Sequence, residues 1–455
     1  MDLRPLFRPE TIAVIGVSLS NDRHPANVIY DKINLRYPVR VFPVNPRGGR
    51  LHRNEVFKDV TAIPEPVDLA VIATRAPHVP AILQGCIEKN VGGATIISGG
   101  FAESGETGLQ DTLVAMARKA DFPFIGPNCL GIYAPDRFDT FFLPGQRLIR
   151  PDAGNVAIVS QSGGVLVDQM VKFKAQGIGL SMGISIGNKA LIREIDLLEY
   201  LAGDPATRVI AFYIEGFGPG EGRDFVKAAH RCPKPIVVLK AGKSAAGSRA
   251  ASSHTASLAG DYTVFSQVLA QHCIAEACSE YELLAFCESL SCYQEAFDGR
   301  VGIITASGGH GVLAVDILSA QGLTVPPLTE TTRKNIFDRL SPSVQPIASV
   351  GNPVDLTGSA ADEDFIGAAI AMSRAPEVES ILLLILPYSP TLSPELGARL
   401  SQIYQEEKKP MIAYVPHEDK YRMLIEGFEL NNIPVSDSVE GAALMTEALR
   451  RCQPC

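Results

Sequence analysis

The chain has 455 residues, of which 46% are hydrophobic and 20% charged, and its formal net charge is −9. This composition is typical of a globular protein with two or three well-packed domains, and it excludes a disordered chain. The acidic balance argues against a surface that binds nucleic acid. The N-terminal residues lack a signal-peptide core, and the strongest apolar run, 381–387, is too short to span a membrane. We therefore expect a cytoplasmic protein that binds neither nucleic acid nor membrane.

Short segments of apolar, β-branched residues recur along the chain, with helical patterns between them. They lie at residues 12–15, 39–44, 69–73, 94–98, 122–125, 156–159, 179–184, 209–214, 235–240, 301–305, 381–386 and 410–415. Because their hydrophobicity is continuous rather than alternating, we predict strands of parallel sheets that are buried on both faces and covered by helices. The predicted fold class is α/β, with three consecutive doubly wound parallel-sheet domains. Their expected bounds are 1–145, 150–297 and 298–455, because turn-forming residues gather near 144–155 and 297–300.

In the first domain, small and polar residues follow the strands at the edge where open parallel sheets bind ligands. The first strand runs into Gly16-Val17-Ser18, and the second runs into Asn45-Pro46-Arg47. This is not the glycine pattern of a dinucleotide site, and the acidic residue that binds a ribose hydroxyl is missing, so a nicotinamide cofactor is disfavoured. Arg47 would instead suit a phosphate group on a ribose. Each turn, taken alone, also fits an ordinary strand–helix connection.

The next two domains each begin with a strand, a Gly-Gly turn and a helix. The turns are Ser160-Gln161-Ser162-Gly163-Gly164 and Thr305-Ala306-Ser307-Gly308-Gly309-His310-Gly311. The free N–H groups at the start of a helix form an anion site, here without the lysine of a P-loop. Two such turns could hold one phosphoryl group from opposite sides, although each alone is weak evidence.

His254 lies in a stretch, residues 242–260, that consists mostly of Gly, Ala, Ser and Thr. Small residues let the backbone approach a ligand, and a neutral imidazole nitrogen can attack phosphorus or accept a proton. Glu215 ends the predicted strand at 209–214, where its carboxylate could accept the imidazole N–H and fix the tautomer. The alternatives are a surface histidine in a flexible loop and a helix-capping or surface carboxylate.

The nine cysteines show no regular spacing. Cys273, Cys278, Cys287 and Cys292 cluster at helical intervals without a set of histidine ligands, which favours core thiols over a zinc site. Cys452 and Cys455 stand at the end of the chain and favour a frayed tail over a redox or metal site. We therefore expect no metal site in this chain.

Together these motifs resemble the α subunit of the NDP-forming acyl-CoA synthetases, the ADP-forming acetate–CoA ligase group, which are relatives of succinyl-CoA synthetase. The resemblance covers almost the whole chain. Its most specific part is Ser252–Gly260, which is similar to the family's phosphohistidine loop. Tyr213–Gly216 resembles the segment whose glutamate orients that histidine. The resemblance implies a Rossmann-like CoA-binding domain followed by two flavodoxin-like ligase domains.

The implied reaction interconverts acyl-CoA, phosphate and ADP with an acid, CoA and ATP, through an acyl phosphate and a phosphorylated His254. The implied cofactors are coenzyme A, phosphate, and ADP or ATP with Mg²⁺. The resemblance makes His254 and Glu215 catalytic. It assigns phosphate binding to Ser162, Gly163, Gly164, Ser307, Gly308, Gly309 and Gly311, and CoA binding to Gly16, Ser18, Asn45, Pro46, Arg47, Thr74 and Asn128.

The sequence departs from this family in three places. No stretch is typical of an ATP-grasp domain, so we expect that domain on a separate β subunit and a hetero-oligomeric enzyme. Leu191 stands about where the family has an aspartate, and Thr74-Arg75 replaces a more apolar pair. The alternative function is a catalytically silent CoA-binding regulatory or scaffold protein. Intact His254, Glu215 and both Gly-Gly turns argue against it.

Overall fold

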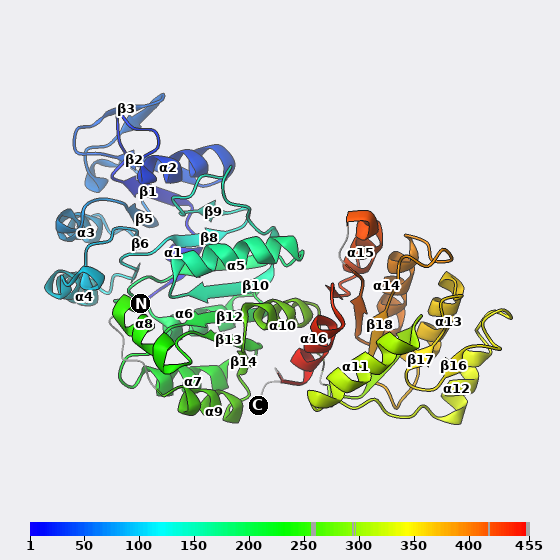
Figure 1. Cartoon of the computed structure of the whole chain (residues 1–455). Helices are drawn as coiled ribbons and strands as arrows, with labels where there is room; N and C mark the ends of the chain where they lie inside the picture. The colour runs from blue at the N-terminus through cyan, green and yellow to red at the C-terminus, as the bar shows by residue number, and fades with distance from the viewer. Residues whose placement is uncertain (256–260, 294, 296, 417–418, 452–455) are drawn as a thin grey trace. The chain divides into compact units, whose positions relative to one another are not determined.

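The computed structural model describes residues 1–255, 261–293, 295, 297–416 and 419–451, and their side chains except those of 251–255. They form two compact units, the first from Met1 to Glu276 and the second beginning at Ala277. Mostly parallel sheets covered by helices make up both units, so the predicted α/β fold class is confirmed (Figure 1). None of the helices in these ranges is long and apolar enough to cross a membrane.

The first sheet has five parallel strands in the order β2-β1-β5-β6-β7. These strands are β1 (Thr11–Ile15), β2 (Arg40–Val44), β5 (Leu69–Ile72), β6 (Gly93–Ile96) and β7 (Phe124–Ile125). The helices between them include α2 (Pro25–Arg36), α3 (Val79–Glu88) and α4 (Thr107–Ala120). The chain passes from β1 to β2 on one side and to β5 on the other. The ends of β1 and β5 therefore form the switch point at which open α/β sheets bind ligands.

The second sheet has seven strands in the order β14-β13-β12-β10-β11-β8-β9, and its edge strand β14 is Ala275–Ala277. Its central parallel strands are β10 (Ala153–Ser160), β11 (Leu180–Ser185), β12 (Val209–Ile214) and β13 (Ile236–Lys240). The helices are α5 (Gly163–Ala175), α6 (Glu194–Gly203), α7 (Glu221–Arg231), α8 (Ala245–Thr255) and α9 (Tyr262–Gln271). Two short strands, β8 (Gly131–Ala134) and β9 (Phe138–Asp139), join this sheet through antiparallel pairing of β8 with β11.

One apolar core joins the first two sheets. Successive residues of a strand point to opposite faces, so β1 contributes Ile12 and Val14 to one core cluster and Ala13 and Ile15 to another. The cluster that contains Ile12 and Val14 also contains residues of β10 and β12. This shared core explains why residues 1–276 form a single compact unit.

The third sheet has six strands in the order β16-β17-β15-β18-β19-β20. They are β15 (Val301–Thr305), β16 (Ser349–Val350), β17 (Val354–Asp355), β18 (Ser380–Leu384), β19 (Met411–Tyr414) and β20 (Val435–Ser436). The helices of this unit include α10 (Glu280–Cys292), α11 (Gly308–Ala320), α12 (Glu330–Phe337), α13 (Asp362–Ser373), α14 (Leu396–Glu407), α15 (Arg422–Glu429) and α16 (Val439–Arg451).

The clustered cysteines do not share one environment. Cys287 is buried in α10, as a core thiol should be, whereas Cys273 and Cys278 are exposed, so our prediction is wrong for these two. Cys278 precedes the N-cap of α10, where the chain runs along the surface. The terminal pair Cys452 and Cys455 lies outside the described residues. Within the described ranges, no group of three or more His, Cys, Asp or Glu side chains is placed to hold a metal ion.

Glu288 places a carboxyl group inside the second unit. It is 7% exposed, and its Oε1 accepts the N–H of Val435 at 3.0 Å. Burial raises the pKa of Glu288 well above its usual value, and the hydrogen bond from Val435 opposes this shift. The folded state therefore keeps a proton that the unfolded state releases above about pH 4.3. The free energy of unfolding must then fall as the pH rises from that point.

We expect Glu288→Gln to stabilise the second unit at pH 8, because glutamine keeps the shape and the acceptor but has no charge to bury. Its advantage over the wild type should shrink as the pH falls to 5. Urea unfolding at both pH values measures the difference. Glu363→Gln, at an exposed carboxylate of α13, is the matched control and should change little. Equal pH dependence in wild type and Glu288→Gln would contradict a protonated carboxyl group.

Candidate active site

Two turns at the carboxyl edge of the first sheet hold most of the residues that we predicted to bind CoA. Gly16 follows β1, and its N–H donates to the carbonyl of Val44 at 2.9 Å. Asn45 follows β2, and its side-chain amide donates to the carbonyl of Val17 at 2.6 Å. Gly16 has a φ of +109°, and a Cβ there would lie 2.4 Å from the carbonyl oxygen of Ala73. Only glycine therefore lets the chain pass so close to the end of β5.

The remaining residues of this group lie beside the same two turns. The N–H of Ser18 donates to Oδ1 of Asn27 at 2.6 Å, and the N–H of Thr74 donates to Oγ of Ser98 at 3.1 Å. Arg47 is exposed, so its guanidinium is available to a phosphate group. The structure thus brings these predicted residues to one edge of the sheet: Gly16, Ser18, Asn45, Pro46, Arg47 and Thr74.

A cavity of about 470 Å³ opens at the carboxyl end of the second sheet. Its lining includes the predicted CoA residue Asn128 and the predicted phosphate residues Ser162, Gly163 and Gly164. Asn128 lies in a turn at the edge of this cavity. Backbone hydrogen bonds connect the turn both to the end of β6 and to the loop after β11. Parts of the two predicted site groups therefore meet in one cavity.

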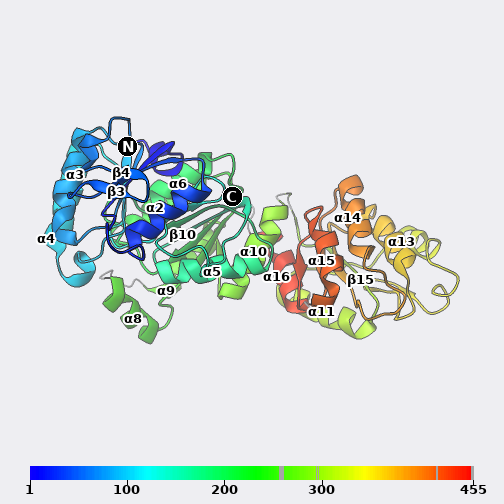
Figure 2. The ribbon, with the colours of Figure 1, turned by 90° about the horizontal axis from the view of Figure 1, so that it is seen from above.

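The start of α5 forms one wall of this cavity. Ser162 is the N-cap, and its Oγ accepts the N–H of Val165 at 3.4 Å. A Cβ on Gly163 would lie 2.9 Å from Cγ of Leu130, so glycine allows Leu130 to pack against the first turn. The helix lies along β10 and β11, which points its free N–H groups at the carboxyl end of the sheet (Figure 1 and Figure 2). Such a helix start favours an anion.

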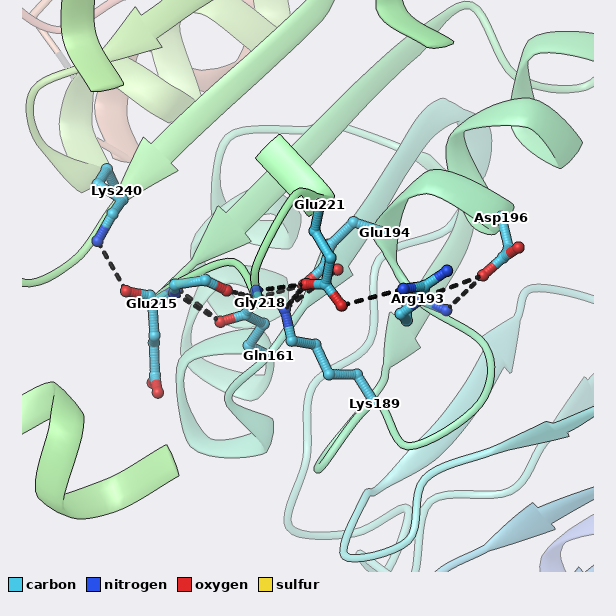
Figure 3. Close-up of polar contacts among 10 residues, drawn as sticks. Gln161, Lys189, Arg193, Glu194, Asp196, Glu215, Gly218, Glu221 and Lys240 are labelled. Carbon is cyan, nitrogen blue, oxygen red and sulfur yellow. Dashed lines mark hydrogen bonds and ion pairs between the residues drawn. The ribbon is translucent and has the colours of Figure 1, made fainter. Parts of the chain in front are cut away.

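Glu215 immediately follows β12 and is 6% exposed. Its N–H donates to Oε1 of Gln161 at 2.7 Å, and its carbonyl accepts a hydrogen bond from Nζ of Lys240 at 2.7 Å. Burial lowers the pKa of Lys240, and the nearby charge of Glu215 opposes that shift. Figure 3 shows that the Glu215 side chain points away from the ion-pair cluster beside it. The peptide groups on both sides of the Glu215 Cα are thus held in place, while the carboxylate points away from the ion-pair cluster.

That neighbouring ion-pair cluster, which the sequence did not reveal, consists of Lys189, Arg193, Glu194 and Glu221. Nζ of Lys189 lies 3.2 Å from Glu194 and 3.1 Å from Glu221, and it donates to the carbonyl of Gly216 at 2.9 Å. Burial alone would raise the pKa of Glu221. The hydrogen bond from the N–H of Gly218 and the positive charge of Lys189 lower it by more, so the pKa of Glu221 lies below its usual value. The cluster ties the helix starts of α6 and α7 to the loop after β11.

His254 belongs by its backbone to α8, but its side chain lies outside the described residues. The same holds for the side chains of Ser252 and Ser253, and residues 256–260 of the predicted phosphohistidine loop are also outside them. The geometry between His254 and Glu215 is therefore not described, and the roles of both residues remain predictions.

In the second unit, the turn before α11 has the same N–H-to-hydroxyl hydrogen bond as the turn before α5, although the Ser307 side chain does not cap α11. The N–H of Ser307 donates to Oγ1 of Thr305 at 3.0 Å, as the N–H of Ser162 donates to Oγ of Ser160 at 3.1 Å. His310, in the first turn, stacks on the ring of Tyr414 with centroids 5.9 Å apart. The predicted residues of this turn, Ser307, Gly308, Gly309 and Gly311, thus surround a second helix start.

Leu191 has a packing role in place of a polar one. It is 8% exposed and belongs to the core cluster that covers one face of the first sheet. An aspartate there would place a charge against apolar side chains, which costs free energy unless a partner is supplied. Leu191 therefore helps to join the loop after β11 to the first sheet.

Comparison with known proteins identifies the family. A CoA-binding domain model matches residues 10–135, and a model of the succinyl-CoA ligase-like flavodoxin domain matches residues 153–290. The sequence is 36% identical to subunit alpha of acetate–CoA ligase (ADP-forming) I from Pyrococcus furiosus, over 99% of this chain and 97% of that protein. The chain belongs to the ADP-forming acetate–CoA ligase family. Our prediction of this family, and with it of an acid–thiol ligase, is confirmed.

Members of the ADP-forming acetate–CoA ligase family share this fold but differ in length. The structure of acetyl-coenzyme A synthetase 1 from Candidatus Korarchaeum cryptofilum, in complex with phosphate and ADP, matches with a TM-score of 0.90 and 30% identity. That match covers 98% of this chain and 96% of the other. Acetate–CoA ligase (ADP-forming) I of Archaeoglobus fulgidus is 36% identical over 84% of this chain, but the match covers only 54% of its length.

Proposed function

We propose that this chain is the CoA-binding and phosphohistidine subunit of an ADP-forming acyl-CoA synthetase, which interconverts acyl-CoA, phosphate and ADP with an acid, CoA and ATP. The observation that carries this proposal is the cavity that Asn128 shares with the start of α5. A thioester held by the CoA-binding residues would meet a phosphate ion held by the helix N–H groups. Positioning of this kind is what acyl and phosphoryl transfer need most.

In the proposed reaction, a phosphate oxygen attacks the thioester carbonyl, the C–S bond breaks, and CoA leaves as a thiolate that takes up a proton. The N–H groups of Gly163 and Gly164 stabilise the anionic phosphate and the acyl phosphate. A ring nitrogen of His254 then attacks phosphorus, the P–O bond to the acyl group breaks, and the acid leaves as a carboxylate. Glu215 accepts the other ring N–H and stabilises the positive charge that forms on the imidazole.

The proposal includes a separate β subunit with an ATP-grasp domain, which binds ADP or ATP with Mg²⁺. Two comparisons support it, because the P. furiosus relative is named subunit alpha and the A. fulgidus relative extends well beyond the part that this chain matches. The phosphoryl group of His254 would pass to the nucleotide on that subunit. The enzyme would then be a cytoplasmic hetero-oligomer.

The alternative, a catalytically silent CoA-binding regulatory or scaffold protein, is not favoured. Two charged residues, Glu215 and Lys240, lie side by side and are each only 6% exposed. Burying charged groups costs free energy, and CoA binding at the edge of the first sheet does not require them. Phosphoryl transfer to His254 would give them a role.

A labelling experiment tests the proposed function. The protein is purified from its own cells, with the chains bound to it, and incubated with ATP labelled in the γ-phosphate and Mg²⁺. We expect label on this chain that is stable in alkali, labile in acid, and discharged by CoA together with an acyl acid. A chain that takes up no label, or label that CoA and acids do not discharge, would contradict the proposal.

A further inference from the structure

We propose that Gln161 is a positioning residue that couples the anion-binding start of α5 to the direction of Glu215. This inference rests on the proposed function, since it assigns Gln161 a part in the same phosphoryl transfer. Gln161 lies between the end of β10 and the N-cap Ser162, so any shift of the helix start moves its backbone. Its side chain reaches across to the end of β12.

All the hydrogen-bonding capacity of the Gln161 amide is used. Oε1 accepts the N–H of Glu215 at 2.7 Å and the N–H of Gly216 at 3.1 Å. Nε2 donates to the carbonyl of Gly216 at 2.9 Å and to Oε1 of Glu194. An amide is the neutral side chain of this length that supplies two acceptor sites on one atom and two donors on the other. The side chain is 8% exposed, so water does not readily replace these partners.

These contacts determine the direction in which the Glu215 side chain leaves the backbone. Gln161 holds the N–H of that residue and Lys240 holds its carbonyl, so the peptide planes on either side of its Cα are fixed. With both planes fixed, the direction of the Cα–Cβ bond is fixed as well. Figure 3 shows Gln161 between Glu215 and the ion-pair cluster, with the Glu215 side chain directed away from both.

The ion-pair cluster keeps Gln161 in this orientation. Glu194 is 1% exposed, and Lys189 holds it in place from 3.2 Å. Because its carboxylate only accepts hydrogen bonds, the NH₂ group of Gln161 must face it, and Oε1 must then face the N–H groups of Glu215 and Gly216. The cluster thereby selects one of the two amide orientations. It acts on Glu215 through Gln161.

The first test compares two Gln→Met substitutions in the labelling assay of the intact complex. Gln161→Met removes every one of these hydrogen bonds at similar volume, and we expect the phosphorylation rate to fall about 100-fold, because misplacing a group by about 1 Å costs that much. The apparent KM for CoA should stay unchanged. Gln169→Met, in the middle of α5, is the control: Gln169 is fully buried, and within the described residues its amide atoms have no hydrogen-bond partner. It should label at the wild-type rate.

A double variant separates positioning from a general structural effect. If Gln161 acts through Glu215, Gln161→Met should slow labelling no further once Glu215→Gln is present, whereas independent effects would multiply. Gln161→Glu keeps the acceptors for both N–H groups and regains a donor when protonated, so its rate relative to wild type should rise as the pH falls from 8 to 6. This variant also provides a result if Gln161→Met folds poorly.

The outcomes distinguish this inference from the proposed function. A wild-type complex without label refutes the proposed function and this inference with it. A labelled wild type, together with full-rate labelling of Gln161→Met, refutes only the positioning role. Multiplied losses in the double variant, or a Gln161→Glu rate that does not depend on pH relative to wild type, refute it as well.

Discussion

Replacing His254 with asparagine is expected to abolish the acid-labile phosphoryl label. Asparagine matches histidine in size and polarity, but its amide nitrogen has no lone pair available to attack phosphorus. Removing a nucleophile costs on the order of 10⁶-fold in turnover, so the label should fall below detection. Labelling with γ-labelled ATP and Mg²⁺, followed by acid and alkali treatment, measures this loss. Net acyl-CoA synthesis should disappear in parallel.

The control for this experiment is the same substitution at His230, an exposed histidine of α7 in the same unit. His230→Asn should keep both label and turnover. CoA should bind His254→Asn as it binds the wild type, because the predicted CoA residues lie at the edge of the first sheet and in the turn at Asn128. Acid-labile label that persists in His254→Asn would place the phosphoryl group on another residue.

The strands that the sequence predicted correctly share one property. Each of the twelve predicted segments overlaps a strand, and the strands in the interior of the sheets, such as β1, β12 and β18, are buried at nearly every position. Continuous apolar, β-branched runs identify such strands because both faces meet helices. The fold class follows from the order of these runs.

Several short strands were missed. Gly131–Ala134 and Phe138–Asp139 are four and two residues long. The first pairs with the antiparallel edge of β11, and the second pairs with the first. β17 and β20 are two residues each and carry no apolar run. Short strands of this kind are determined by tertiary pairing, which local patterns do not contain.

The residues of the candidate site also divide into those that a local pattern predicts and those that only the fold brings together. Strand-end turns such as Gly16 and Ser162 were predicted because glycine and serine mark the places where a backbone turns or caps a helix. Gln161 and Lys189 were not predicted to act together, because their contacts come from the ends of three strands and the starts of two helices. The sequence offered one signal, the long polar side chain of Gln161 directly after a buried strand. The groups that Gln161 binds can be identified only from the fold.

The largest loss of stability is expected from Asp139→Asn. Asp139 is fully buried in β9, with Oδ1 2.9 Å from Nζ of Lys32 in α2 and Oδ2 2.5 Å from Nε of Arg150. Asparagine keeps the shape but leaves the buried Lys32 and the partly buried Arg150 without their counter-charge. Breaking a buried pair in this way costs about 3–5 kcal/mol. Urea unfolding of the wild type and the variant at pH 6 measures the difference, and Asp224→Asn, at an exposed pair with Lys227, should cost less than about 1 kcal/mol.

The pH dependence of this loss identifies its source. Burial lowers the pKa of Lys32 to about 8, and the charge of Asp139 opposes that shift. Without that charge, the pKa of Lys32 in the folded state must fall further, so the folded variant releases a proton that its unfolded state keeps. A lysine with a lowered pKa adds stability as the pH rises through that value. The gap between Asp139→Asn and wild type should therefore narrow from pH 6 to pH 8. A gap of constant size would show that the unpaired charge on Lys32 does not cause the loss.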